Sequence, residues 1–271
     1  MKQAPVCPYD RDELVLHLVP QGAIFALHMT RSYTFRAFLG ILGAVALLLM
    51  VNTASAQEPS ARPPGIASPA PLHLWQWERS IGLSLSTLPR VIVEEELNQS
   101  PALDLRSRLG LPWGFSADAR LLIQVLTNHL EFGGSWSFAI GRFAVSLGDN
   151  SAWWFGFLTI DGFDNSANGW LNYPNISLGY DFGRFRVVLR AEMLLVLSFR
   201  SYAGDYLLSS DKNGFGGFSS SVTIEQPFWK NTHVLIGFKA SYLKYFYQSW
   251  FTYETFNRYL FIPELSFGFI L

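Results

Sequence analysis

The sequence predicts an all-β protein: a closed, antiparallel, up-and-down transmembrane β-barrel of about ten strands, within a range of roughly eight to twelve. From residue 78 onward, apolar and polar residues alternate, which is the spacing of a strand with two unlike faces. Charged residues make up 15% of the 271 residues and aromatic residues 16%, whereas a soluble domain carries roughly 25% charge. The one long apolar run lies near the N-terminus, so strands rather than helices are expected to meet the membrane.

The N-terminal region has the order of a secretory signal peptide. Two arginines precede the apolar run 37–51, and small residues follow it. The run is about 15 residues long, short of the roughly 20 that a spanning helix needs, although an uncleaved anchor is the alternative. We expect a signal peptide over 29–56. The expected cleavage motif consists of Ala54, Ala56 and Gln57.

The segments on either side of the signal are expected to lie outside the fold. Residues 1–28 are acidic and are interpreted as an over-extended start. They contain Cys7, the single cysteine, so the mature chain is expected to have no disulfide and no thiolate metal site. Residues 57–77 are rich in Pro and Ala and predict a flexible leader. The barrel is then expected over 78–271.

The alternation is clearest over 184–200. One face of this segment is an unbroken apolar row, and the other carries arginine at both ends and in between. A helix would scatter these arginines around its cylinder, whereas a strand places them on one face. The apolar row consists of Phe185, Val187, Leu189, Ala191, Met193, Leu195, Leu197 and Phe199.

The connections are expected to be short at one end of the barrel and long at the other, as in membrane barrels. Strands are expected at 79–87, 101–111, 116–130, 134–147, 151–161, 172–182, 184–199, 217–226, 232–247 and 257–271. Short turns are expected at 112–115, 148–150, 183 and 227–231. Longer loops are expected at 88–100, 162–171, 200–216 and 248–256. A turn is also expected at Gly133, and it is the exception because it is short although it falls among the long loops. A bulge is expected near Gly141 and Arg142.

A soluble exported barrel that holds an apolar ligand would also alternate, with its apolar face inside. The tryptophans favour the membrane alternative, because they lie near predicted strand ends, where a bilayer gathers them into two belts. The interfacial aromatic residues are expected to be Trp113, Trp136, Trp153, Trp154, Trp170, Trp229 and Trp250.

The last strand ends on alternating aromatic and apolar residues: Leu265, Phe267, Phe269 and Leu271. Over 78–271 the chain resembles the small, porin-like outer-membrane β-barrels of Gram-negative bacteria, whose last strand carries such a signal. Their usual terminal Phe is replaced here by Leu. The resemblance implies location in the outer membrane, contact with its lipid and lipopolysaccharide, and recognition by the barrel-insertion machinery. It implies no cofactor.

The polar face of a ten-stranded barrel is expected to fill a narrow interior with charge. Cations outnumber acids in this expected network, which predicts either an ionic plug or an anion-favouring pore or solute site. The network is expected to include Asp104, Arg106, Arg108, Asp118, Arg120, Arg142, Asp181, Arg186, Arg190, Glu192, Glu225, Lys239, Arg258 and Glu264.

The leading hypothesis is a non-enzymatic barrel with a structural, binding or small-solute transport role. The enzymatic alternative is a lipid-modifying barrel using His129, which lies near Glu131 and Ser135 in the sequence. No metal-binding pattern is found. The net charge of −1 does not favour nucleic-acid binding.

Overall fold

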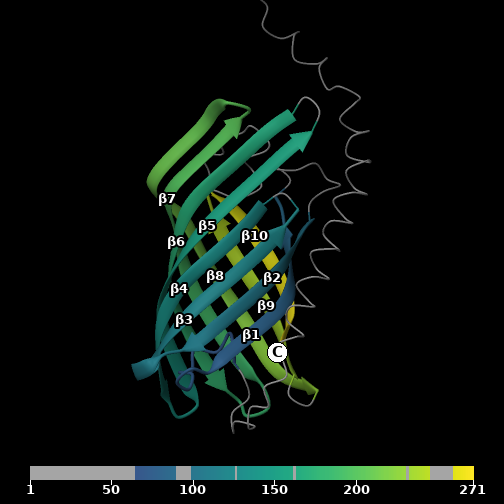
Figure 1. Ribbon diagram of the computed structural model, residues 1–271. Helices are drawn as coiled ribbons and strands as arrows, with labels where there is room; N and C mark the ends of the chain where they lie inside the picture. Colours follow the sequence, from purple (N-terminus) through teal and green to yellow (C-terminus); the bar gives the residue numbers. More distant parts are fainter. Residues whose placement is uncertain (1–64, 90–98, 126, 161–162, 230–231, 245–258) are drawn as a thin grey trace, which may run out of the picture. The chain divides into compact units, whose positions relative to one another are not determined.

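The computed structural model describes residues 65–89, 99–125, 127–160, 163–229, 232–244 and 259–271. In this part of the chain ten antiparallel strands form one closed barrel, in which β1 pairs with β10 and every other pair is adjacent in sequence (Figure 1). The predicted closed, up-and-down topology is therefore confirmed. The strands are β1 (Trp77–Thr87), β2 (Gln99–Gly110), β3 (Phe115–Gln124), β4 (Thr127–Ile140), β5 (Phe143–Ile160), β6 (Phe163–Asp181), β7 (Arg186–Ala203), β8 (Tyr206–Trp229), β9 (Thr232–Leu243) and β10 (Leu260–Ile270).

The barrel belongs to a compact unit that spans 57–271. Within the described residues, no helix is long and apolar enough to cross a membrane. Several predictions fall on residues outside the described part of the chain: the signal peptide, its cleavage motif at Ala54, Ala56 and Gln57, most of the loop 88–100, the loop 248–256 with Trp250, and Arg258.

The end of the barrel that holds the short turns is called the short-turn end below. Three of its four turns lie where the sequence predicted them, but the turn predicted at 148–150 is wrong. The chain instead turns at Gly141 and Arg142, where a bulge was expected, and Gly141 has a φ of 60°. Gly148 faces inward in the middle of β5, and a Cβ there would lie 2.8 Å from the Asn175 side chain. Gly133, likewise, sits where a Cβ would meet Asn150. These two glycines leave room for neighbouring side chains and do not mark turns.

The long loops predicted at 162–171 and 200–216 are also wrong, because most of these residues belong to strands. β5 to β8 extend past their neighbours at the end opposite the C-terminus, as Figure 1 shows. The extensions are richer in polar residues than the rest of the wall, for example at Asp211 and Lys212 of β8, although Leu207 and Leu208 near the end of β8 are exposed. A strand outside the membrane needs no apolar face, so its sequence resembles that of a loop.

The outer surface of the barrel is apolar. Large apolar side chains are exposed around the wall, including Leu83, Phe132, Leu147, Ile176, Leu189, Val222, Ile236 and Phe267. Serine, carboxylate and guanidinium groups are buried inside, including Ser80, Asp104, Arg108 and Glu225. This is the reverse of a soluble barrel, and an exposed apolar surface of this extent is expected to face lipid.

The tryptophans lie partly where the sequence predicted them. Trp113 and Trp136 are exposed at the short-turn end, and Trp153 packs on Trp170 on the outer face toward the opposite end. The short turn predicted at 148–150 put Trp153 at the short-turn end and Trp136 at the opposite end. Because the chain turns at 141 instead, the two residues lie at the reverse ends. Trp154 is 3% exposed and points into the barrel, so it is not an interfacial residue. The side chain of Trp229 lies outside the described residues.

Candidate functional site in the barrel interior

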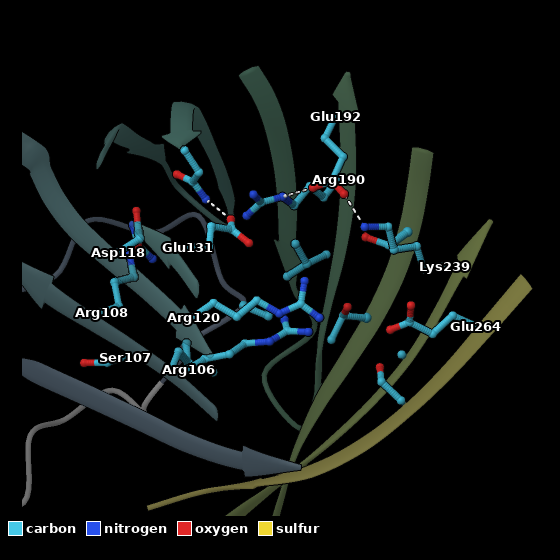
Figure 2. A pocket seen from close by; sticks show the side chains of 18 of the residues that line it. Arg106, Ser107, Arg108, Asp118, Arg120, Glu131, Arg190, Glu192, Lys239 and Glu264 are labelled. Carbon is cyan, nitrogen blue, oxygen red and sulfur yellow. Dashed lines mark hydrogen bonds and ion pairs between the residues drawn. The ribbon is translucent and has the colours of Figure 1, made fainter. Parts of the chain in front are cut away.

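The described interior has three levels. The leader segment, residues 65–76, occupies the short-turn end. The charged layer lies above it, around Asp104 and Glu192, and Figure 2 shows this layer from close by. The apolar layer, which includes Trp154 and Leu171, lies nearer the opposite end.

The leader segment is held by buried carboxylates and a buried guanidinium of the wall. The Gly65 amide donates to Glu78 Oε2 at 3.0 Å, and the Ala67 amide donates to Glu225 Oε1 at 2.7 Å. The Ser68 carbonyl accepts a hydrogen bond from Arg108. The wall therefore satisfies backbone groups that a segment without secondary structure cannot satisfy for itself.

Glycines of the wall leave space for the same segment. A Cβ on Gly179 of β6 would lie 2.6 Å from Pro69 Cδ, and one on Gly110 of β2 would lie 2.1 Å from the His73 carbonyl oxygen. The sequence predicted a flexible leader over 57–77, whereas residues 65–76 have defined contacts with the barrel. The composition gave no sign of this, because the partners of these residues lie far away in the sequence.

Two carboxylates organise the charged layer, and each binds two cations. Asp104 accepts from Arg106 at 2.6 Å and from Arg120 at 2.8 Å. These three residues come from the inner faces of β2 and β3, and the register that places Arg106 opposite Arg120 brings both to Asp104.

Glu192 of β7 forms the second group. It binds Arg190 at 3.2 Å and Lys239 of β9, and it also accepts from Ser219 Oγ at 2.9 Å. In Figure 2, Arg106 and Arg120, the partners of Asp104, lie across the pocket from Arg190, Glu192 and Lys239. Paired charges of this kind stiffen a barrel interior while keeping each ion compensated.

A cavity of about 110 Å³ lies between the two groups. Ile66 and Ala67 of the leader segment line it, together with charged residues of the wall that include Arg106, Arg120, Glu131, Glu192, Lys239 and Glu264. A cavity of this size and polarity holds a few water molecules or a small polar solute.

The predicted excess of cations in the interior is wrong for the described residues. The inward cations are Arg106, Arg108, Arg120, Arg186, Arg190 and Lys239; the inward acids are Glu78, Asp104, Asp118, Glu131, Glu192, Glu225 and Glu264. Arg142 is exposed in a turn, and Asp181 is a partly exposed partner of Arg186 at the rim, 3.3 Å away. The interior is thus nearly balanced in charge and is not Arg-rich in net terms.

Two inward acids were missing from the predicted network. Glu78 precedes the first predicted strand, and Glu131 was placed next to a turn that does not exist. Glu131 is 6% exposed and accepts a hydrogen bond from Asn150. Correct positions for the turns around β4 would have placed Glu131 on the inner face by alternation alone.

The apolar layer was not predicted. Trp154 stacks on Phe199 with ring centroids 5.3 Å apart, and it packs with Leu171, Leu194 and Val196. Phe199 was expected on the outer face. Leu197 is bulged out of the β6–β7 pairing, because Trp170 pairs with Ser198 and Leu171 with Val196. The bulge reverses the alternation and turns Phe199 inward.

The trio proposed for the enzymatic alternative is not assembled as a triad. His129, Glu131 and Ser135 all face inward from β4, but His129 and Ser135 are six residues apart on one strand. That spacing separates their Cα atoms by about 20 Å. Ser135 Oγ instead donates to Asp118 at 2.9 Å, and His129 packs edge-on against Tyr173. Among the described residues, no cluster of His, Cys, Asp and Glu is placed to hold a metal ion.

The last strand shows the outward face that the sequence predicted. Leu265 and Phe267 are exposed, and Leu271 ends the chain with its amide donating to the Arg79 carbonyl. Gly268 faces Gly82 of β1 across the seam, where a Cβ on either residue would crowd the other backbone. Recognition of this strand by the insertion machinery stays a prediction.

No protein-family model and no curated protein matches the chain. Among solved structures, Neisserial surface protein A is similar over 72% of this chain and 96% of its own, at 11% identity and a TM-score of 0.34. The translocator domain of the autotransporter NalP from Neisseria meningitidis is similar over 73% and 89%, at 12% identity and a TM-score of 0.34. Outer membrane phospholipase A from Escherichia coli is similar over 82% and 96%, at 10% identity and a TM-score of 0.31. Scores this low carry no argument about function.

The fold class therefore rests on the geometry of the chain itself. A closed ring of ten strands, an apolar outer wall and a charged interior occur together in the described residues. This is the architecture of a transmembrane barrel, since only closed sheets leave no unpaired strand edge in lipid. The described chain has the fold of an outer-membrane β-barrel.

Proposed function

We propose that the chain is an integral outer-membrane β-barrel whose interior is filled by its own residues and whose role is structural or binding, without free ion conduction and without enzymatic activity. The observation that carries this proposal is the leader segment in the short-turn mouth, with the Ala67 amide 2.7 Å from a Glu225 oxygen. The paired charges of Asp104 and Glu192 occupy the level above it.

The outer face and the two ends of such a barrel determine what each part of it contacts. The apolar outer face contacts outer-membrane lipid, and the extended ends of β5 to β8 lie at the level of lipopolysaccharide. The short-turn end faces the periplasm, because membrane barrels carry their short turns there. Export by the predicted signal peptide and folding by the insertion machinery belong to the same proposal.

Planar-bilayer recording tests the closed interior directly. Purified full-length protein, inserted from detergent, is expected to give no discrete current steps, because ions cannot pass the leader segment and the paired charges without breaking several hydrogen bonds. A general porin inserted under the same conditions is the positive control. Stable, voltage-independent openings of the intact protein would contradict the proposal.

A non-enzymatic role is supported by the separation of Ser135 from His129 along β4. A lipid ester would also have to enter the barrel to reach His129, which is 5% exposed. Hydrolysis by a Ser–His pair needs the two side chains within hydrogen-bond reach. Ser135 does not offer that contact to His129, because it lies about 20 Å away along β4 and donates to Asp118.

A further inference from the structure

A polar patch lies on the outer wall of the barrel. It consists of Asp149 and Ser151 of β5 and Asn172 of β6, which point outward; both β5 residues are exposed. The amide nitrogen of Asn172 lies 2.8 Å from Asp149 Oδ1 and 3.4 Å from Ser151 Oγ. These residues take no part in the closed interior, because their side chains face away from it.

The patch lies on the outer face between two rows of large apolar side chains. A strand crosses the hydrocarbon region with about 9–11 residues, and on β5 this length runs from Phe143 near the turn to Trp153 in the opposite aromatic belt. Asp149 stands between them. Exposed Leu147 and Ile176 flank it on the short-turn side, and Trp153 and Trp170 flank it on the other.

Lipid tails cannot satisfy this patch. A carboxylate offers about four acceptor positions, and Asn172 is the side chain whose amide reaches Asp149 in the described part of the wall. Ionisable and amide groups at this depth are costly in lipid and mark contacts with other polar groups.

On the β3–β4 side of Asp149 the wall carries the small residues Ala117 and Gly134, although the exposed Phe132 lies opposite Ser151. The register places Ala117, Gly134, Asp149 and Pro174 side by side across β3 to β6. Small side chains in this row let another wall approach closely. The wall on the opposite side of the barrel, around β10 and β1, instead presents Leu265, Phe267 and Leu83.

We propose that two copies of this chain associate side by side in the membrane through the polar patch, about a two-fold axis. The patch holds donors and acceptors together, so a second copy turned by a half rotation brings its Asn172 amide to the first copy's Asp149 carboxylate, and the reverse. No other component is needed to satisfy the patch. This inference rests on the proposed membrane-spanning barrel.

Cross-linking in native outer membranes tests the interface. In a Cys7→Ser background, Ser151→Cys is expected to form a covalent dimer of this chain on mild oxidation, because residues near the axis meet their own copies. Leu265→Cys, on the opposite wall, is the matched control and is expected to stay monomeric. Equal cross-linking of both variants, or an adduct of Ser151→Cys with a different protein, overturns the proposal.

Mass measurement in detergent gives an independent test. The unsubstituted protein is expected to be a dimer, and Asp149→Val is expected to weaken association about tenfold, since each hydrogen bond occurs twice across a two-fold axis. Leu265→Val, a change of similar size in the opposite wall, is expected to leave it unchanged. A monomer at all concentrations overturns the proposal. A heat-modifiable gel shift in each variant separates this failure from failure of the barrel to insert.

Discussion

Deletion of Gly65–Ala70 is expected to open the short-turn mouth and to expose the cavity to solutes from that side. The deletion removes the two amides that donate to Glu78 and Glu225 and the carbonyl that accepts from Arg108. It also empties the space that Gly179 leaves for Pro69. The wall itself loses no strand, so the barrel is expected to fold and to keep its gel shift.

Thiol labelling measures the opening. Ser221 lines the cavity from β8, so Ser221→Cys in a Cys7→Ser background reports on access with a membrane-impermeant maleimide. Labelling is expected to be slow in the intact chain and faster by at least about tenfold after the deletion, because a closed site reacts only through local opening. Deletion of residues 58–63, equal in length and outside the expected cleavage motif, is the control. Fast labelling in the intact chain would show that the leader segment does not close the mouth.

Asp104→Ala is expected to be among the most destabilising single changes in the interior. Asp104 accepts from both Arg106 and Arg120, and its side chain is 5% exposed. Removing it leaves two inward guanidinium groups without their carboxylate, for a cost of about 3 kcal/mol. The measurement is the urea midpoint for loss of the folded band in lipid vesicles.

Asp118→Ala is the matched control. Asp118 lies 3.5 Å from Arg108 and is more exposed, at 25% of its side chain. Arg108 also keeps hydrogen bonds to Ser116, Ser137 and the Ser68 carbonyl. The loss is therefore expected to be smaller than that of Asp104→Ala, because the buried Arg108 keeps these three other partners. Equal losses for the two variants would contradict the structural role given to Asp104.

The sequence was sufficient to predict the barrel because alternation is a local property. In β7, Arg186 and Arg190 face inward while Leu189 and Met193 face outward, as the two-residue period requires. Most of the charged lining followed from the same rule. Alternation places a residue on the inner or outer face without reference to the rest of the fold.

The errors arose where a local signal has two physical causes. Glycine marks a turn when its φ is positive, as at Gly141, but it also leaves room for a neighbour, as at Gly133 and Gly148. A bulge at Leu197 reverses a face without changing composition. These features depend on which residues lie across the strand pair, and that is known only once the register is known.

The pairing of charges was beyond sequence reasoning for the same reason. Asp104 meets Arg120 because β2 and β3 pair with Arg106 opposite Arg120. Glu225 holds the leader segment across a separation of 158 residues. No pattern within either segment indicates the other, so the closed mouth could be found only from the structure.

Electrophoretic mobility of the protein from fractionated cells tests the central claim, that this chain forms a closed barrel in the outer membrane. In the membrane fraction, the unheated protein is expected to run as a compact band that shifts to its full apparent mass on boiling, because a closed sheet resists detergent until heat unfolds it. Recovery of the folded protein from the periplasmic fraction without detergent, with no shift on boiling, would contradict the account.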